Sequence, residues 1–219
     1  FLLDISRNFY GLDKIKQLVD LMSIYKLNHL DLKLTDDEGW RLEIPGLPEL
    51  TEVGAKRGYT KDEQDRLIPM YGSGADGGET GNGFLSQQDF IDLLQYARVR
   101  NVTVIPQISF PSHARAAVVS MEARRQRFLA AGNEAAAEEF ALMDPEDKSV
   151  YRSAQLYNDN AINICRESAY AFFEKVVDEV VSMYADANVK LTKFSIGADE
   201  LPYGVWQASP LCVDKISDK

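Results

Sequence analysis

Residues 29–34 read His-Leu-Asp-Leu-Lys-Leu, with a leucine at every second position between polar side chains. This period of two is typical of a β-strand, because successive side chains of a strand point to opposite faces. The residues before it have a helical period: Asp13 can serve as an N-cap, and apolar side chains recur from Ile15 to Tyr25. An apolar run with β character, residues 1–5, opens the chain. The stretch around residue 30 therefore predicts a strand–helix–strand unit.

The same alternation continues toward the C-terminus. After an irregular segment over residues 35–85, Ser86 and Asp89 form a pattern like a capping box, at the start of a helix that runs to Ala97. The remaining predicted elements are a strand over 102–108 that ends near Pro106, a helical stretch over 114–143 interrupted at Gly132–Asn133, a helix capped by Ser168, and a fourth strand over 191–196. This order of elements implies parallel strands joined by right-handed crossovers.

Two α/β architectures fit that order: an open doubly wound sheet, and the first half of a (β/α)8 TIM barrel with long loops after its strands. A full barrel needs about 250 residues and eight strands. The chain has 219 residues, which is room for roughly half a barrel with loops of this length. Length alone does not choose between the two.

The composition excludes several classes of protein. Hydrophobic residues make up 45% of the chain, so it can build a core and is not intrinsically disordered. Acidic residues number 34 against 24 basic ones, which gives a formal net charge of −10. A surface this acidic repels phosphate backbones and anionic lipids, so nucleic-acid binding is not expected. The apolar runs are much shorter than the ~20 residues of a membrane-spanning helix, so membrane insertion is not expected either.

No cofactor or metal site is predicted. Residues 72–77 match the pattern G-x-G-x-x-G, but Pro69 precedes them and further glycines follow, whereas a dinucleotide site needs a strand before the motif and a helix after it. The histidines, His29 and His113, have no C-x-x-C partner. Cys165 and Cys212 fit either a single disulfide or two buried free thiols, and both alternatives remain open.

Polar side chains follow each of the four predicted strands. The first delivers Arg7, the second the acidic segment 35–41 with Asp36, the third His113, and the fourth Asp199 and Glu200. In parallel α/β folds the loops at the C-terminal ends of the strands hold the active site, so these side chains are expected at one rim. Two adjacent carboxylates there can take different roles, one protonated and the other ionised. The set together points to an active site more strongly than any one residue does.

Short motifs spread over nearly the whole chain resemble family-20 glycoside hydrolases, and within them the chitobiase branch of the β-N-acetylhexosaminidases. They occur in the family's order and are Asp4–Phe9, Tyr25–Asn28, Asp36–Arg41, Ile44–Thr51, Tyr96–Arg98, Val104–Pro106, Pro111–Ala116 and Gly197–Glu200. The resemblance implies that residues 1–219 form a partial catalytic (β/α)8 barrel: strands 1–4, helices 1–3 and the start of helix 4.

The resemblance also assigns roles by position. Glu200 would be the general acid, with a pKa raised by burial. Asp199 would orient the substrate's own 2-acetamido group, which attacks the anomeric carbon in the substrate-assisted route. Arg7 would grip sugar hydroxyls at the non-reducing end, and Asp36 and His113 would form a supporting hydrogen-bond network around Glu200. The implied enzyme is a retaining exo-β-N-acetylhexosaminidase that removes terminal N-acetylglucosamine from chitobiose or other oligosaccharides, without a cofactor or metal.

Some positions depart from the family's pattern. Asp31 and Lys33 stand where the family usually has two histidines, Gln107 and Ser109 stand where it has two acids, and Ala198 replaces a glycine. These changes favour an alternative, a non-catalytic carbohydrate-binding or structural relative. A third interpretation is a flavodoxin-like binding domain.

Three further expectations follow from the family rather than from the residues. The other half of the barrel, from the same or another chain, would supply most of the aromatic pocket wall, and Trp40 and Trp206 would be packing residues. The isolated half barrel would be a poor enzyme, because its edge strands would lack partners. The protein would be secreted, periplasmic or lysosomal.

Overall fold

A parallel β-sheet forms the centre of the computed structural model, which describes residues 1–75 and 80–216, the side chains of Asp214 and Ile216 excepted. The strands are β1 (Leu2–Asp4), β2 (His29–Lys33) and β5 (Thr103–Gln107), in the order β1-β2-β5. Leu32 is in register with Leu3 on one side and Pro106 on the other. The predicted parallel arrangement of these three strands is confirmed. The G-x-G-x-x-G motif lies partly outside the described residues.

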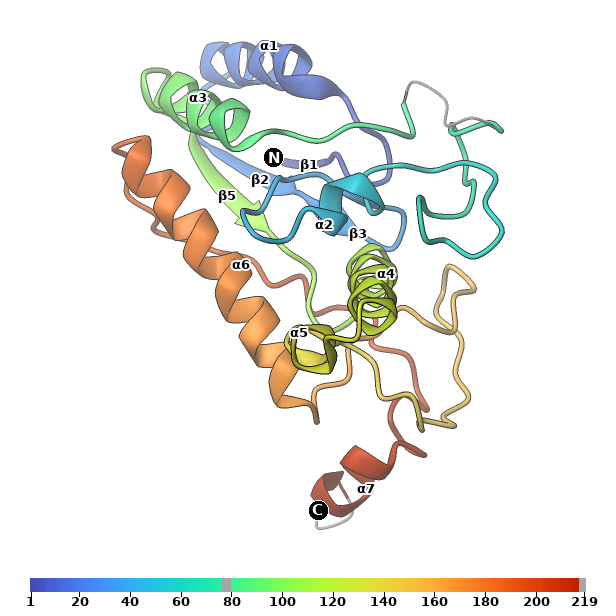
Figure 1. Cartoon of the computed structure of the whole chain (residues 1–219). Coiled ribbons are helices and arrows are strands. Elements are labelled where there is room, and N and C mark those ends of the chain that lie inside the picture. The colour runs from blue at the N-terminus through green and yellow to red at the C-terminus, as the bar shows by residue number, and fades with distance from the viewer. Residues whose placement is uncertain (76–79, 217–219) are drawn as a thin grey trace.

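Three helices connect the strands and lie along one face of the sheet (Figure 1): α1 (Gly11–Ile24), α3 (Gln87–Arg98) and α6 (Glu167–Asp186). Leu30 and Leu32 of β2 are fully buried in the core beside these helices. The Tyr184 hydroxyl of α6 donates to the carbonyl of Val104 in β5 at 2.9 Å, which ties the helix to the sheet. Alternating leucines on β2 and apolar stripes on the helices thus produce a single core.

The helix starts agree only in part with the sequence patterns. Ser86 and Asp89 form the predicted capping box of α3. Two other predicted caps are wrong. Helix α1 already begins at Gly11, which places Asp13 in its first turn. Helix α6 begins at Glu167, and the Ser168 hydroxyl donates to the carbonyl of Ala141 at 2.6 Å, a tertiary partner that local sequence does not reveal.

Further elements extend from the C-terminal edge of the sheet. Strands β3 (Thr35–Asp36) and β4 (Gly39–Trp40) form an antiparallel hairpin whose turn is acidic. Helix α4 (Arg115–Ala130) packs against that hairpin and against α2 (Glu49–Glu52) (Figure 1). The helical stretch predicted over 114–143 is two helices, α4 and α5 (Glu134–Glu138), separated at the predicted break. Because β3, β4 and α2 all lie within residues 35–85, that segment is less irregular than expected.

The fourth strand is shorter than predicted. Of residues 191–196, only Ser195 forms a parallel bridge, with Gln107 of β5. The Ser195 amide donates to Pro106 and the Ser195 carbonyl accepts from Ile108, both at 3.0 Å. This segment has β5 on one side, and within the described part of the chain its other side has no strand partner, which limits the pairing.

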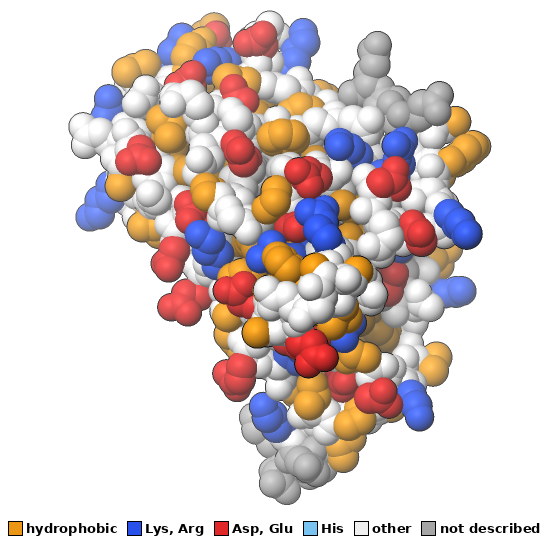
Figure 2. Space-filling model, in the orientation of Figure 1, with side chains coloured by type: hydrophobic (Ala, Val, Ile, Leu, Met, Phe, Trp, Pro, Cys, Tyr) orange, Lys and Arg blue, Asp and Glu red, His pale blue; other side chains and the backbone are white. Residues whose placement is uncertain are grey.

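Beyond that segment the chain leads to α7 (Pro210–Ile216), which is joined to the start of α6 by a disulfide between Cys165 and Cys212. The disulfide settles the alternative that the sequence left open. Trp206 is buried beside these cysteines and Trp40 is buried in the main core, as expected of packing residues. Within the described residues no helix is long and apolar enough to cross a membrane. Acidic and basic side chains are interspersed over the face shown in Figure 2.

Candidate active site

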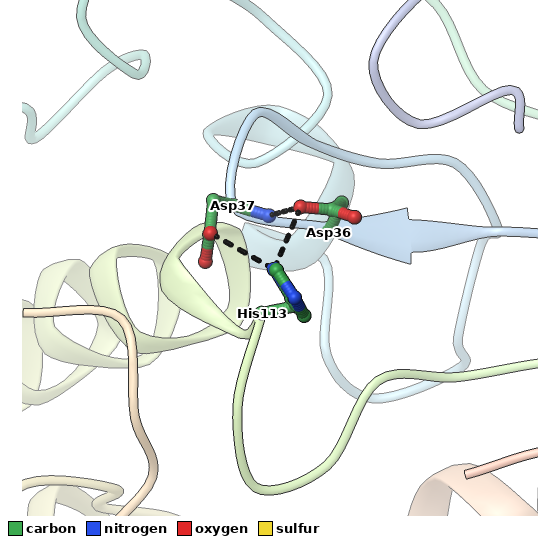
Figure 3. A group of neighbouring side chains, drawn as sticks. All are labelled: Asp36, Asp37 and His113. Atoms are coloured by element: carbon green, nitrogen blue, oxygen red, sulfur yellow. Dashed lines mark hydrogen bonds and ion pairs between the residues drawn. The ribbon is translucent and has the colours of Figure 1, made fainter. Parts of the chain in front are cut away.

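A buried histidine stands at the centre of the candidate site (Figure 3). His113, from the loop after β5, is 2% exposed, and its Nδ1 lies 3.6 Å from Asp36 Oδ1 and 3.3 Å from Asp37 Oδ2. Both aspartates belong to the β3–β4 hairpin and are also buried. The predicted pair Asp36–His113 is therefore assembled by the ends of two neighbouring strands.

The other nitrogen of the ring faces the predicted catalytic pair. His113 Nε2 lies 3.3 Å from Glu200 Oε2 and 3.9 Å from Asp199 Oδ2. The Ser112 hydroxyl donates to the backbone carbonyl of Asp199 at 2.5 Å, and the Gln155 amide donates to Glu200 Oε2 at 3.0 Å. The structure thus brings residues more than 160 positions apart in sequence to one imidazole ring.

Two of these residues have an unusual backbone. His113 has a φ of 51° and Glu200 has a φ of 53°, in the left-handed region that non-glycine residues seldom occupy. Such conformations cost free energy and cluster at functional sites. The burial expected around Glu200 is absent from this chain: its side chain is 51% exposed and that of Asp199 is 65% exposed.

Arg7 is placed at the same rim, as predicted, but it is held by carboxylates. Its guanidinium reaches Asp4 at 2.7 Å, Asp36 at 3.0 Å and Glu38 at 3.5 Å, while 41% of its side chain stays exposed. Each ion pair uses one N–H of a different guanidinium nitrogen: Nη1 with Asp4, Nη2 with Asp36 and Nε with Glu38. Each terminal nitrogen has a second N–H, which leaves donors for a ligand.

The pKa values of His113, Asp36 and Glu38 depend on the charges of their neighbours. Hydrogen bonds with Asp36 and Asp37 outweigh the effect of burial and raise the pKa of His113 to about 10. Burial acts to raise the pKa of Asp36, but the bond with His113 and the charges of Lys33 and Arg7 prevail and lower it to about 2. Burial and the charges of Asp36 and Asp37 raise the pKa of Glu38 to about 7. At neutral pH the centre is thus an imidazolium bound by two aspartates.

Asp36, Asp37 and His113 also lie close enough together to ligate a metal ion. Cationic side chains already satisfy this cluster. Lys33, which is 6% exposed, and Arg7 both pair with Asp36, and the raised pKa keeps a proton on the ring nitrogen that a metal would need. The donor set therefore fits a hydrogen-bond network better than a metal centre.

Three of the positions that depart from the family's pattern contact the site or the segment that carries it. Lys33 pairs with the buried Asp36. The Ser109 hydroxyl donates to the carbonyl of Thr35 at 3.0 Å. Gln107 and Ser109 crowd Gly197, because an added Cβ there would lie 2.8 Å from Gln107 Nε2 and 3.1 Å from Ser109 Oγ, and these side chains would have to shift. Asp31, two residues before Lys33 on β2, is partly buried, and burial raises its pKa.

Sequence reasoning missed Asp37, Glu38 and Gln155 as individual site residues. The first two lie in the quoted acidic run after β2, but nothing in the run shows which carboxylate faces His113. Gln155 comes from the long loop between α5 and α6, and no local signal places it beside Glu200. Its position depends on tertiary structure.

The comparisons with known proteins all point to one family. The profile of the glycosyl hydrolase family 20 catalytic domain matches residues 1–219. The chain is 50% identical over 200 residues to the N,N'-diacetylchitobiase of Vibrio harveyi, covering 91% of this chain and 23% of that protein. It is 44% identical over 210 residues to a beta-hexosaminidase of Vibrio vulnificus, covering 96% of this chain and 25% of that protein.

A solved structure is similar over the whole fold. The GH20 exo-β-N-acetylglucosaminidase of Vibrio harveyi in complex with N-acetylglucosamine superposes with a TM-score of 0.82 at 36% identity, covering 99% of this chain and 29% of that one. The chain thus spans about a quarter of the length of the relatives it matches. Catalytic domains of this family are TIM-barrel-like, which accounts for the parallel sheet with helices along one face. The chain belongs to glycosyl hydrolase family 20.

Proposed function

We propose that this chain supplies the proton-transfer half of the active site of a retaining exo-β-N-acetylhexosaminidase. The observation that carries the proposal is the placement of His113, which binds Asp36 and Asp37 with one nitrogen and faces Asp199 and Glu200 with the other. Relatives named chitobiase and beta-hexosaminidase, and a neighbour holding N-acetylglucosamine, support the same substrate class. The substrate would be chitobiose or another oligosaccharide that ends in N-acetylglucosamine.

In the proposed reaction Glu200 donates its proton to the glycosidic oxygen as the bond to the anomeric carbon breaks. Asp199 orients the 2-acetamido group, whose carbonyl oxygen attacks that carbon to form an oxazolinium ion. Water then opens this ion and returns a proton to Glu200, so the β configuration is retained. The imidazolium of His113, 3.3 Å from Glu200, stabilises the carboxylate formed in the first step.

Arg7 holds hydroxyls at the non-reducing end in this proposal. Its ion pairs with Asp4 and Asp36 keep the guanidinium in one plane and orientation, so its remaining N–H groups are pre-oriented for hydroxyl oxygens. Lys33, paired with Asp36, helps to keep that carboxylate ionised for His113.

The rest of the barrel completes this half site. We infer that the chain forms the first four βα units, with residues 191–196 as the start of the fourth strand, and that the remaining units come from the same or another chain. They would cover the exposed faces of Asp199 and Glu200 and supply the burial that this chain lacks. The disulfide supports an oxidising compartment, as in secreted or periplasmic proteins.

The test is hydrolysis of an aryl N-acetylglucosaminide and of chitobiose by the full-length protein, beside Glu200→Gln. The matched control is Glu134→Gln, an exposed acid on α5 away from the site. Glu200→Gln is expected to lower kcat on chitobiose by about 10²–10⁴-fold, the usual contribution of a general acid, and the control to leave it unchanged. Sugar binding without hydrolysis in the parent would show a non-catalytic relative instead.

A further inference from the structure

Gln155, in the loop between α5 and α6, contacts the proposed acid, and the proposed reaction gives it no role. Its side-chain amide donates to Oε2 of Glu200 at 3.0 Å. The same oxygen lies 3.3 Å from His113 Nε2, and the raised pKa of His113 keeps a hydrogen on that nitrogen at neutral pH. Two N–H donors from different segments of the chain therefore converge on one oxygen of the Glu200 carboxyl group.

The two oxygens of Glu200 are thus unlike each other. Each carboxylate oxygen has two acceptor positions, and the donors from Gln155 and His113 fill both of them on Oε2. Within residues 1–75 and 80–216, Oε1 has no hydrogen-bond or ion-pair partner, and the side chain is 51% exposed. A proton on Oε2 would displace one of the two donors, so the protonated acid carries its hydrogen on Oε1.

The Gln155 amide has no other polar task among the described residues. Its bond to Glu200 is the one hydrogen bond that the side chain forms there, and its own carbonyl oxygen is buried without a partner. An unpaired buried acceptor costs free energy, so this amide is not placed for the stability of its loop. Local costs of this kind occur where function, rather than stability, determines a side chain's position.

The loop that carries Gln155 is fixed on both sides of it. The Ser153 amide donates to the Tyr157 carbonyl at 2.7 Å, and the Tyr157 amide donates to the Ser153 hydroxyl at 3.1 Å. Both residues are buried. Further along, Asn160 donates to Asp37 at 3.1 Å, and this aspartate also binds the imidazole of the site. The amide of Gln155 is therefore held in place before a substrate arrives.

We propose that Gln155 is a positioning residue for the general acid: together with His113 it occupies Oε2 of Glu200, so that the proton leaves from Oε1. The role rests on the proposed function and adds which oxygen transfers the proton. As the O–H bond at Oε1 breaks, a new O–H bond forms at the glycosidic oxygen, which keeps the electron pair of its cleaved bond to the anomeric carbon. Both N–H donors stay on Oε2 and stabilise the carboxylate as its charge develops.

The test removes the donor of Gln155 in the full-length protein. Gln155→Met keeps the length of the side chain without an N–H, and Gln155→Glu keeps its shape with a carboxylate that only accepts. Each is expected to lower kcat on chitobiose about ten- to a hundredfold, the range for a lost hydrogen bond to a charged group, with little change in KM. On a dinitrophenyl N-acetylglucosaminide, whose leaving group needs little protonation, the loss is expected to stay below about threefold.

The matched control is Gln126→Met. Gln126 is an exposed glutamine on α4 that also donates to a glutamate, Glu122, at 2.6 Å, and its loss should leave both substrates unaffected. A second comparison places Gln155→Met in the Glu200→Gln background. There it should cost no further activity, because a residue that acts through Glu200 has no acid left to position.

The outcomes separate this role from the proposed function. Equal losses on the two substrates, an unchanged kcat on chitobiose, or a full additional loss in the Glu200→Gln background would overturn the role of Gln155. Activity that depends on Glu200 but not on Gln155 would refute this inference alone. A parent whose hydrolysis of chitobiose does not depend on Glu200 would overturn the proposed function, and the role of Gln155 with it.

Discussion

At the scale of single residues, His113 stands out for its strongly raised pKa. Its hydrogen bonds with Asp36 and Asp37 keep the ring protonated far above the ordinary pKa of histidine, and both of its nitrogens face carboxylates. A pKa this high keeps the ring protonated at neutral pH. Its role in the proposed mechanism is to supply a fixed positive charge next to Glu200.

This assignment predicts how His113 titrates. Its folded pKa of about 10 lies above the unfolded value of 6.5, so its contribution to stability is complete below pH 6.5 and is lost as the pH rises through about 10. At ~1.4 kcal/mol per pKa unit, the upper limit of that contribution is about 5 kcal/mol. NMR of the labelled imidazole measures the pKa directly. Asp37→Asn should lower it, and a midpoint near 6.5 in the parent would contradict the assignment.

The site residues show what sequence could predict at this scale. The positions of the strand ends predicted that the segments carrying Arg7, Asp36, His113, Asp199 and Glu200 meet at one rim, and the resemblance to the family singled out these residues within them. Buried charges with structural roles were not predictable. Arg41 is fully buried and donates to the backbone carbonyls of Ser6, Ala55, Gly81 and Gly83, and Glu49 is buried between Arg124 and Arg127. Charge alone would place them at the surface.

Helices α3 and α6 differ in how much local capping and how much tertiary packing stabilise them. Helix α3 has both: its apolar face packs Phe90 against Tyr184 of α6, and its first turn is closed by the Ser86–Asp89 capping box. Helix α6 has no side-chain cap hydrogen bond and relies on packing.

Removal of the α3 cap should therefore have a measurable cost. Ser86→Ala removes the acceptor for the Asp89 amide and one donor to the Asp89 carboxylate, and is expected to lower the free energy of unfolding by about 1 kcal/mol. Denaturant unfolding of the full-length protein measures this, with Ser86→Thr as the control that keeps the hydroxyl. An equal loss in both variants would show that the hydroxyl is not the cause.

Strands and helices with strong periodicity were predicted well, and elements that depend on partners were not. The alternating leucines identified β2 correctly because both its neighbours are present. Residues 191–196 were also predicted as a strand, but that segment pairs only with β5 and forms a single bridge. The Ser168 hydroxyl has a cap-like position in sequence, yet it donates to the carbonyl of Ala141 and does not cap α6.

On the scale of the whole molecule, the segment that carries Asp199 and Glu200 is held at both ends. Before them, the Phe110 amide donates to the Ile196 carbonyl at 2.9 Å. After them, the disulfide ties Cys212 to Cys165 at the start of α6. The proposed catalytic carboxylates thus lie on a span that is anchored to β5 on one side and to α6 on the other.

The disulfide is expected to stabilise the fold. It joins residues 47 positions apart, and replacing both cysteines with serine should cost about 2–4 kcal/mol, because the unfolded chain regains the freedom that the cross-link removes. Unfolding of the full-length parent and of the double variant measures the difference. Alkylation of both thiols in denatured, unreduced protein would contradict the pairing.

The central claim is that Glu200 protonates the leaving sugar. A general acid matters most when the leaving group is a poor one, so the direct test compares two substrates in Glu200→Gln. The loss of kcat/KM relative to the full-length parent is expected to be about 10³-fold on chitobiose and less than about tenfold on a dinitrophenyl N-acetylglucosaminide, which needs little protonation. Equal losses on both substrates, or no loss on chitobiose, would contradict the assignment of Glu200 as the acid.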